Sequence, residues 1–323
     1  MIARFATVAC CGLLNTFAPV TTQAQSYPNK PIRMIIGYPP GGGTDIVARL
    51  VAQQLADSLG QQVVVDNRSG ANTMLAAGLA AKAAADGYTL LFASASLTIN
   101  PSLYSKVPYD AARDFAPVTL VASTPFVLVV QSSFSARSVR ELVTLAKSKP
   151  GELMYSSGGS GSTGHLAAEL FKSTAGVEIQ HIPYKGLAAA ITDLLGGRVS
   201  LTFASLPSVA PLIKAGRLKA LALTTTERLA TLPDLPTMAE SGFPGYDVNQ
   251  WFGVLVPAGT PRAIIVKLNT EIRQFLNKPE VKERFSLVGA EPVSNSPEQF
   301  SAYIKADLSK WAKVVSMTGA RVD

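Results

Sequence analysis

The sequence predicts an α/β fold with two lobes, each built on a mostly parallel sheet, joined by two crossing strands. Short apolar, β-branched runs alternate with helical segments along almost the whole chain, which is typical of this architecture. The 323 residues are enough for two domains with cores of their own. The apolar runs at 126–130 and 251–257 stand where the chain would pass from the first sheet into the second and return.

The expected elements follow from these runs and from the residues that end them. Helices occupy the segments between the apolar runs and stop at glycines such as Gly176 and Gly196. Ser138 with Glu141 three residues later forms a capping box and marks a helix start. The expected strands are 32–36, 63–65, 89–93, 115–122, 126–130, 153–157, 179–182, 201–203 and 220–224. The expected helices are 44–59, 73–85, 138–147, 162–174, 188–195, 208–215, 262–277, 279–287 and 297–317.

The order of these elements predicts the domain boundaries. Residues 25–125 and 250–323 would form the first lobe, and residues 126–249 the second. Ligands of open α/β sheets bind beyond the carboxyl ends of the strands. We therefore expect a ligand in the cleft between the two lobes.

Residues 1–24 are interpreted as a cleavable export signal. Arg4 gives a short basic start, an apolar segment follows, and Thr22-Gln23-Ala24 places small residues at the −3 and −1 positions of a cleavage site. The alternative is a membrane anchor, but Asn15 and Pro19 interrupt the apolar segment, which is shorter than the ~20 residues that span a bilayer. The sequence thus predicts a periplasmic protein.

Both cysteines, Cys10 and Cys11, lie inside this signal. In a lipoprotein, Cys10 would be the cysteine that carries the lipid, but the apolar stretch before it is too short to insert into a membrane. The mature chain would then have no disulfide, thiol nucleophile or thiolate metal site. Two isolated histidines do not make a zinc site, so we expect no metal and no cofactor.

Composition and charge exclude further classes of protein. Hydrophobic residues make up 47% of the chain and charged residues 16%, which is typical of a packed globular protein. The 29 basic and 22 acidic residues give a formal net charge of +7, without a basic block interleaved with aromatics, so nucleic acid is a poor candidate partner. The positive excess would either steer small anions or only keep the protein in solution. We expect a monomer.

The first candidate binding loop follows the strand at 32–36. It reads GYPPGGGTD over residues 37–45 and leads directly into a helix, so unpaired N–H groups would point at an anion in front of that helix. A nucleotide loop would end in Gly-Lys-Ser/Thr, which is absent. Asp45 is expected to order the loop rather than to bind an anion. The candidate ligand-binding residues are Tyr38, Gly41, Gly42, Gly43 and Thr44.

A second strand–glycine–helix junction spans residues 154–166. Gly159, Gly161 and Gly164 satisfy G-x-G-x-x-G, but no acidic residue ends the next strand, so a dinucleotide site is disfavoured. We interpret the junction as a second anion site, to which Ser162 and Thr163 would contribute hydroxyl groups at the helix start.

Other candidate residues lie where further strands end. Ser94 and Ser96 follow the strand at 89–93 and would either bond a ligand or form an ordinary turn. Ser205 follows the strand that begins at 201. Tyr38 and Tyr184 would offer aromatic walls with a polar tip.

An exported hydrolase is the alternative from another class of protein. Ser160 or Ser162 would be the nucleophile and His165 the base. There is no G-x-S-x-G elbow, and a histidine at the opening of a helix more often packs or bonds locally.

Several motifs together resemble one known family. The chain carries YPNKPIR at 27–33, PPGGGTD at 39–45, DNR at 66–68, ADGYTL at 85–90, NPSLY at 100–104, PYKG at 183–186 and WFG at 251–253. In this order they resemble the Bug receptors, the solute-binding proteins of tripartite tricarboxylate transporters. The resemblance runs from residue 27 to residue 323.

The resemblance implies a type II periplasmic-binding-protein fold, whose lobes close like a flytrap on a small carboxylate. Family members often bind dicarboxylates, and some bind amino-acid or aromatic acids. Carried onto this chain, the binding loops are 38–44, 94–96 and 157–163, which adds Ser157 to the candidates, with the turn at Tyr184. The ligand would pass to a two-component membrane permease without covalent chemistry. A sensor partner that presents the bound ligand to a membrane kinase is a further alternative.

Two departures from the family pattern bear on the ligand. Phe203-Ala204-Ser205 stands where members commonly have Phe-Asp-Asn, and the missing carboxylate argues against an amino-acid ligand, whose ammonium would lose its partner. Residues 69–74 read SGANTM where members more often have Pro-Gly-Ala-Gly-Gly. Fewer glycines and an added methionine would narrow the cleft, which leaves room for an aromatic or short aliphatic acid.

Overall fold

The computed structural model describes residues 27–41, 43–229 and 231–322. The predicted signal peptide and the candidate Gly42 therefore lie outside the described residues. Within the described ranges, no helix has the length and apolar character that crossing a membrane requires.

The first lobe is built around three parallel strands. β1 lies between β2 and β3, and all three run in the same direction. The strands are β1 (Ile32–Ile36), β2 (Val63–Asn67) and β3 (Thr89–Ser94). The helices of this lobe are α1 (Gly43–Leu59), α2 (Met74–Ala81), α3 (Ser96–Leu103), α8 (Arg262–Leu276) and α9 (Pro279–Leu287).

The second lobe repeats this plan with β5 between β6 and β7, again parallel. The strands are β5 (Met154–Ser157), β6 (Gln180–Pro183), β7 (Leu201–Ser205) and β8 (Leu218–Leu223). The helices are α4 (Val139–Ser148), α5 (Thr163–Ala175), α6 (Leu187–Leu195) and α7 (Leu206–Lys214). Ser138 caps α4 and accepts a bond from the Glu141 amide, but the reciprocal bond of the predicted capping box is replaced, since the Glu141 carboxylate accepts from the Arg137 amide.

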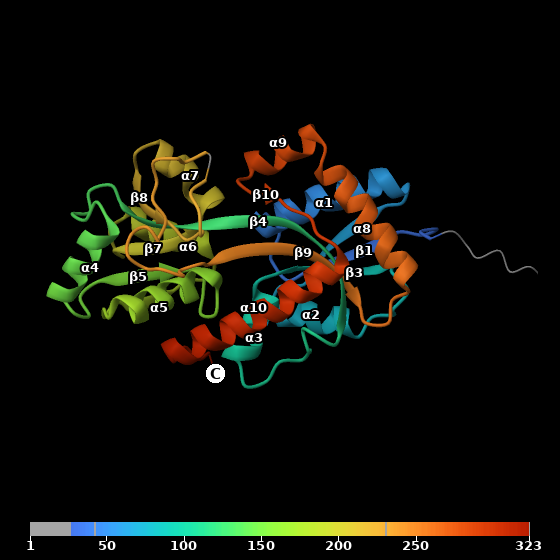
Figure 1. Ribbon diagram of the computed structural model, residues 1–323, viewed down its shortest axis with the longest axis horizontal. Coiled ribbons are helices and arrows are strands. Elements are labelled where there is room, and N and C mark those ends of the chain that lie inside the picture. Colours follow the sequence, from blue (N-terminus) through green and yellow to red (C-terminus); the bar gives the residue numbers. More distant parts are fainter. Residues whose placement is uncertain (1–26, 42, 230, 323) are drawn as a thin grey trace, which may run out of the picture.

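Two long strands join the lobes. β4 (Phe115–Gln131) and β9 (Asn249–Pro257) pair antiparallel and run side by side across the molecule (Figure 1). They connect the two halves into the strand order β2-β1-β3-β9-β4-β7-β5-β6, with β8 and the short β10 (Glu291–Pro292) also paired to β4. The predicted two-lobed α/β fold with two crossing strands is confirmed.

The prediction of separate strands at 115–122 and 126–130 was wrong. The chain forms one strand of 17 residues instead. Pro125 falls between the two runs and has no N–H to donate, which is why the sequence suggested a break. In the fold, Pro125 lies opposite Asn249 of β9, and β7 and β8 continue the pairing from Phe126 onward, so the ladder passes the proline without interruption.

Two helices also differ from the expectation. The helix expected at 73–85 is the shorter α2, which follows a 3-10 turn at Ala71–Thr73. α3 was not expected, because Asn100 and Pro101 are poor helix formers. It carries the chain from the end of β3 toward the second lobe and so bears directly on the site.

The C-terminal helix α10 (Pro297–Thr318) braces the two lobes. It packs on α3, α8 and β4 and also on α5, and Figure 1 shows it alongside the paired strands β4 and β9. Asp307 of α10 is buried, and its Oδ2 accepts bonds from the indole of Trp251 on β9 (2.8 Å) and the hydroxyl of Thr98 on α3 (2.6 Å). One carboxylate thus ties three elements together at the junction.

We expect Asp307→Ala to lower the free energy of unfolding by about 1–3 kcal/mol, because the buried indole N–H and hydroxyl lose their acceptor. Urea unfolding measures the change. Lys305→Ala, at an exposed position of the same helix, is the matched control and should change stability by no more than about 0.5 kcal/mol. Equal losses in both variants would contradict a role for the buried carboxylate.

Candidate ligand-binding site

The pairing register directs the carboxyl ends of both sets of parallel strands toward the middle of β4. Ser94, which ends β3, pairs with Phe252, and Phe252 pairs with Ala122 of β4. Ser205, which ends β7, pairs with Phe126. Ala122 and Phe126 are four positions apart, or about 13 Å along an extended strand. The loops that follow these strands therefore approach one another from the two lobes.

The first glycine loop is held by the carboxylate of Asp45. Its Oδ2 accepts bonds from the Gly41 N–H and from Arg49 Nε, both 2.9 Å, and its Oδ1 accepts a bond from Asn67 Nδ2, also 2.9 Å. Burial opposes ionisation, but the bonds from Arg49, Asn67 and Gly41 outweigh it and lower the pKa of Asp45. The expected role of Asp45 in ordering the loop is confirmed.

This arrangement decides which donors of the loop stay available. The Gly41 amide is used within the loop. Thr44, near the start of α1, is 7% exposed, and its hydroxyl has no partner among the described residues. The N-terminal turn of α1 thus offers Thr44 as a donor, and Gly43 begins the helix beside it.

Three hydroxyl groups form a cluster next to this loop. The Tyr38 hydroxyl lies 2.7 Å from Ser94 Oγ and 3.0 Å from Ser96 Oγ. Burial raises the pKa of Tyr38, and the bonds to the two serines oppose the shift, so the phenol stays protonated at neutral pH. The structure therefore brings three candidates, Tyr38, Ser94 and Ser96, into one hydrogen-bonded group.

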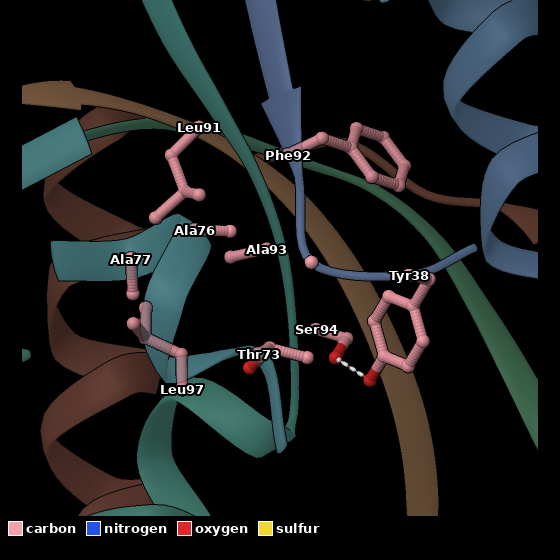
Figure 2. Close-up of a pocket in the computed structure, with 10 residues that line it drawn as sticks. Tyr38, Thr73, Ala76, Ala77, Leu91, Phe92, Ala93, Ser94 and Leu97 are labelled. Carbon is pink, nitrogen blue, oxygen red and sulfur yellow. Dashed lines mark hydrogen bonds between the residues drawn. The ribbon is translucent and has the colours of Figure 1, made fainter. Parts of the chain in front are cut away.

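Figure 2 shows a small cavity beside the Tyr38–Ser94 bond. Apolar side chains, among them Leu91, Ala93 and Leu97, line it together with Thr73, and its volume is about 10 Å³. This volume is about what one water molecule needs. The wall behind the hydroxyl cluster is therefore tightly packed. Met74, which was expected to line the cleft, contributes to the buried core instead.

The second glycine loop uses two of its own amides internally. Ser157, fully buried, lies with its Oγ 2.7 Å from His181 Nε2 and accepts a bond from the Gly159 N–H (3.2 Å). The Gly161 N–H donates to His165 Nδ1 at 3.1 Å. The hydroxyl of Ser157 thus stabilises the loop from its buried side.

The start of α5 keeps free donors. Ser162 is the N-cap and accepts a bond from the His165 amide (3.3 Å). Thr163 is only 4% exposed, and its hydroxyl and N–H have no partner in the described part of the chain. Its Oγ1 is not one of the two fully buried side-chain atoms without a partner there, so it reaches solvent-accessible space. Thr163 is the best-placed donor of this loop.

Gly164 allows α5 to start very close to the end of β7. A Cβ atom at this position would lie 2.5 Å from the carbonyl oxygen of Phe203, which is far inside van der Waals contact. Only glycine permits this approach, which places the N-terminus of α5 at the carboxyl end of the second sheet.

The remaining candidates bond elsewhere. The Tyr184 hydroxyl donates to Asp193 Oδ2 at 2.6 Å, and Ser205 Oγ lies 2.8 Å from Ser208 Oγ. Both residues stand at the carboxyl ends of second-lobe strands, as expected, but within the described ranges no hydrogen bond joins either one to the Tyr38 cluster or to Thr163.

The two histidines lie behind the second loop, where His181 bonds the buried Ser157, and His165 does not pair with the serines of the hydrolase alternative. The rings of His165 and His181 stack with centroids 4.3 Å apart, and Tyr155 stacks on His181 at 4.7 Å. Among the described residues, neither ring nitrogen of His165 bonds the hydroxyl of Ser160 or Ser162. The Nδ1 atom accepts from Gly161 instead, and the described residues contain no cluster of three or more metal-ligating side chains.

Sequence reasoning missed one contact between the loops of the two lobes. Asn72 Nδ2 of the first lobe donates to Asn100 Oδ1 (2.7 Å) and to the Gly161 carbonyl (3.2 Å) of the second glycine loop. Residues 69–74 were noted only as a departure from a family pattern. The available signal was Asn72 itself, because asparagine tolerates the left-handed backbone conformation of such turns.

The comparisons with known proteins agree with this geometry. The model of the tripartite tricarboxylate transporter family receptor matches residues 47–320. Protein BugT of Bordetella pertussis is 43% identical over 307 residues, which cover 94% of each chain. The structure of R. palustris Rpa4515 with adipate has 41% identity and a TM-score of 0.85, and the match covers 92% of this chain and all of that one. MatC from Rhodopseudomonas palustris with bound malate has 29% identity, a TM-score of 0.81, and coverage of 90% of this chain and all of that one.

These findings define the class of protein, which is a two-lobed solute-binding receptor and not an enzyme. The chain belongs to the tripartite tricarboxylate transporter receptor family, which includes the Bug proteins. Members of this family are periplasmic receptors. The predicted resemblance is confirmed, and the hydrolase alternative is wrong because the matching family and its solved structures are solute-binding receptors.

The histidine stack predicts a pH dependence of stability. Burial, with a smaller contribution from His165, lowers the pKa of His181 from 6.5 to about 4. Between these pH values the unfolded chain binds a proton that the folded chain does not, so stability falls as the pH falls from 6.5 toward 4. We expect the thermal unfolding midpoint of His181→Gln to fall less than that of the natural sequence over this interval. The reference is the unfolding midpoint at pH 8, where His181 and the glutamine that replaces it are both neutral. Equal pH dependence of the two proteins would contradict the lowered pKa of His181.

Proposed function

We propose that this protein is a periplasmic receptor that closes around a small organic carboxylate and delivers it to the permease of a tripartite tricarboxylate-type transporter. The observation that carries the proposal is Thr163 at the start of α5, with a nearly buried hydroxyl and N–H that have no partner among the described residues. A nearly buried donor at a helix N-terminus favours an anion, because the helix dipole is positive there.

The first lobe supplies a complementary set of donors. Thr44 stands in the first turn of α1, and the hydroxyl cluster of Tyr38, Ser94 and Ser96 follows the ends of β1 and β3 in the same lobe. None of these groups is charged, so a carboxylate would be held by oriented hydroxyls and amides rather than by a salt bridge. Such donors hold one carboxylate of the ligand whatever its chain length. The group at the other end of the ligand then needs a hydrogen-bond partner of its own.

The relatives support a carboxylate ligand. Rpa4515 was solved with adipate and MatC with malate, both of which are dicarboxylates. We propose the same ligand class for this chain and the same place between the lobes, with lobe boundaries close to Pro125 in β4 and Asn249 in β9. The match to a transporter receptor family supports delivery to a membrane permease, which completes the proposal.

We expect the mature protein to bind at least one acid from a panel of mono-, di- and tricarboxylates that includes adipate and malate. Thr163→Val should weaken this binding about ten- to a hundredfold, since a hydrogen bond to a charged group is lost while the shape of the side chain is kept. Isothermal titration calorimetry measures the affinity.

Thr144→Val is the matched control, because Thr144 is an exposed threonine on α4 whose hydroxyl bonds the carbonyl of Arg140 in its own helix. It should leave the affinity unchanged. Absence of binding across the whole panel would overturn the proposed function, and equal affinities of the two valine variants would remove Thr163 from the site.

A further inference from the structure

Three consecutive residues between β2 and α2 adopt a left-handed backbone without being glycine. Ala71, Asn72 and Thr73 have φ angles of 45°, 46° and 73°. Side chains disfavour this conformation, and such a run persists only where the surrounding structure requires it. The contacts of its side chains show what holds the run in place.

Thr73 connects the run to the first glycine loop. A Cβ atom at Gly37 would lie 2.5 Å from Thr73 Cβ, so the backbone of the loop passes directly against this side chain. Gly37 is followed by Tyr38 of the hydroxyl cluster, and all three residues line the cavity of Figure 2. The position of the run is thus fixed relative to the binding residues of the first lobe.

Asn72 is anchored firmly within the first lobe. Its Nδ2 donates to Asn100 Oδ1 at 2.7 Å, and Asn100 Nδ2 donates back to the Asn72 carbonyl at 2.8 Å. Asn100 is fully buried on α3 and also donates to the Tyr109 hydroxyl at 3.3 Å. This reciprocal pair of amides holds the Asn72 side chain in one orientation.

From this orientation Asn72 reaches the second lobe. Its Nδ2 donates to the Gly161 carbonyl at 3.2 Å, a contact between residues 89 positions apart in the sequence. A Cβ atom at Gly161 would lie 3.0 Å from Asn72 Nδ2 and 3.1 Å from Leu103 Cδ1, so the loop packs closely on the first lobe here. Gly161 belongs to the loop that places Thr163.

We propose that Asn72 is a latch between the lobes, which stabilises the closed conformation and positions the second glycine loop over the bound ligand. The inference rests on the proposed function in one respect, namely that the ligand lies between the two glycine loops. The strained backbone is what brings the Asn72 amide to the Gly161 carbonyl. Asn72 need not contact the ligand to set its affinity, because each stabilisation of the closed state adds to the apparent affinity.

The test compares Asn72→Gly with Ala71→Gly in the mature chain. Glycine suits a positive φ at both positions, so both variants remove strain, but only the first removes the amide that bonds Gly161. The isosteric Asn72→Asp is a third variant, which replaces the donor by an acceptor opposite the Gly161 carbonyl. Thermal unfolding establishes that all three chains fold.

Small-angle X-ray scattering, without ligand and with adipate as the probe, reports how open the lobes are. We expect a larger radius of gyration for Asn72→Gly and Asn72→Asp than for Ala71→Gly in at least one of these conditions. We also expect affinity for adipate to fall about three- to tenfold in Asn72→Gly, as the loss of one neutral hydrogen bond implies. Faster dissociation should account for most of the loss.

The outcomes separate the latch from the proposed function. Equal scattering of all the chains in both conditions overturns the latch, even if adipate binds with unchanged affinity. Failure of every chain to bind adipate counts against the proposed ligand class, but the scattering of the ligand-free chains still decides whether Asn72 holds the lobes together.

Discussion

Residues 122–126 of β4, where its pairing passes from β9 to β7, determine how the two lobes are placed relative to each other. Both strands run through the whole molecule, and the parallel strands of each lobe attach to them so that their carboxyl ends point inward. The glycine loops begin at these ends, which is why two segments more than a hundred residues apart come to face each other. Asp307 reinforces the arrangement, since it binds Trp251 of β9 and Thr98 of α3 from α10, which packs on both lobes. Any motion of the lobes has to be accommodated around this buried junction.

Much of the fold could be predicted because it follows from local patterns. The alternation of apolar runs and helical segments located nearly every element, and glycines and capping residues gave ends such as Ser138 and Gly176. The errors arose where a distant partner overrides a local preference. Pro125 suggests a break in a strand, but pairing with β9, β7 and β8 on both sides keeps β4 continuous. Asn100 and Pro101 disfavour a helix, but α3 is stabilised by packing on α10 and by the bonds of Asn100.

In the candidate site, too, local patterns predicted one part, and contacts between residues of the folded chain decided the rest. Sequence reasoning identified which loops carry donors, because a strand that ends in glycines before a helix leaves backbone N–H groups unpaired at the helix start. It could not identify which donors are already used. The amides of Gly41, Gly159 and Gly161 bond Asp45, Ser157 and His165 within their own loops, so these glycines shape the loops. The donors left without a partner among the described residues lie just after these glycines, at Thr44 in α1 and Thr163 in α5.

Gly161 connects the interior of the second lobe to the surface of the first. Its N–H donates to His165 Nδ1, and its carbonyl accepts the Asn72 amide. His165 can accept this bond only while Nδ1 carries no proton, and burial lowers the pKa of His165, so the acceptor is preserved at neutral pH. Burial, and after it the stacked His165, also lower the pKa of His181, so both rings are neutral at neutral pH. A neutral histidine inside the second lobe therefore holds the Gly161 amide, in the peptide plane that precedes the carbonyl that Asn72 contacts.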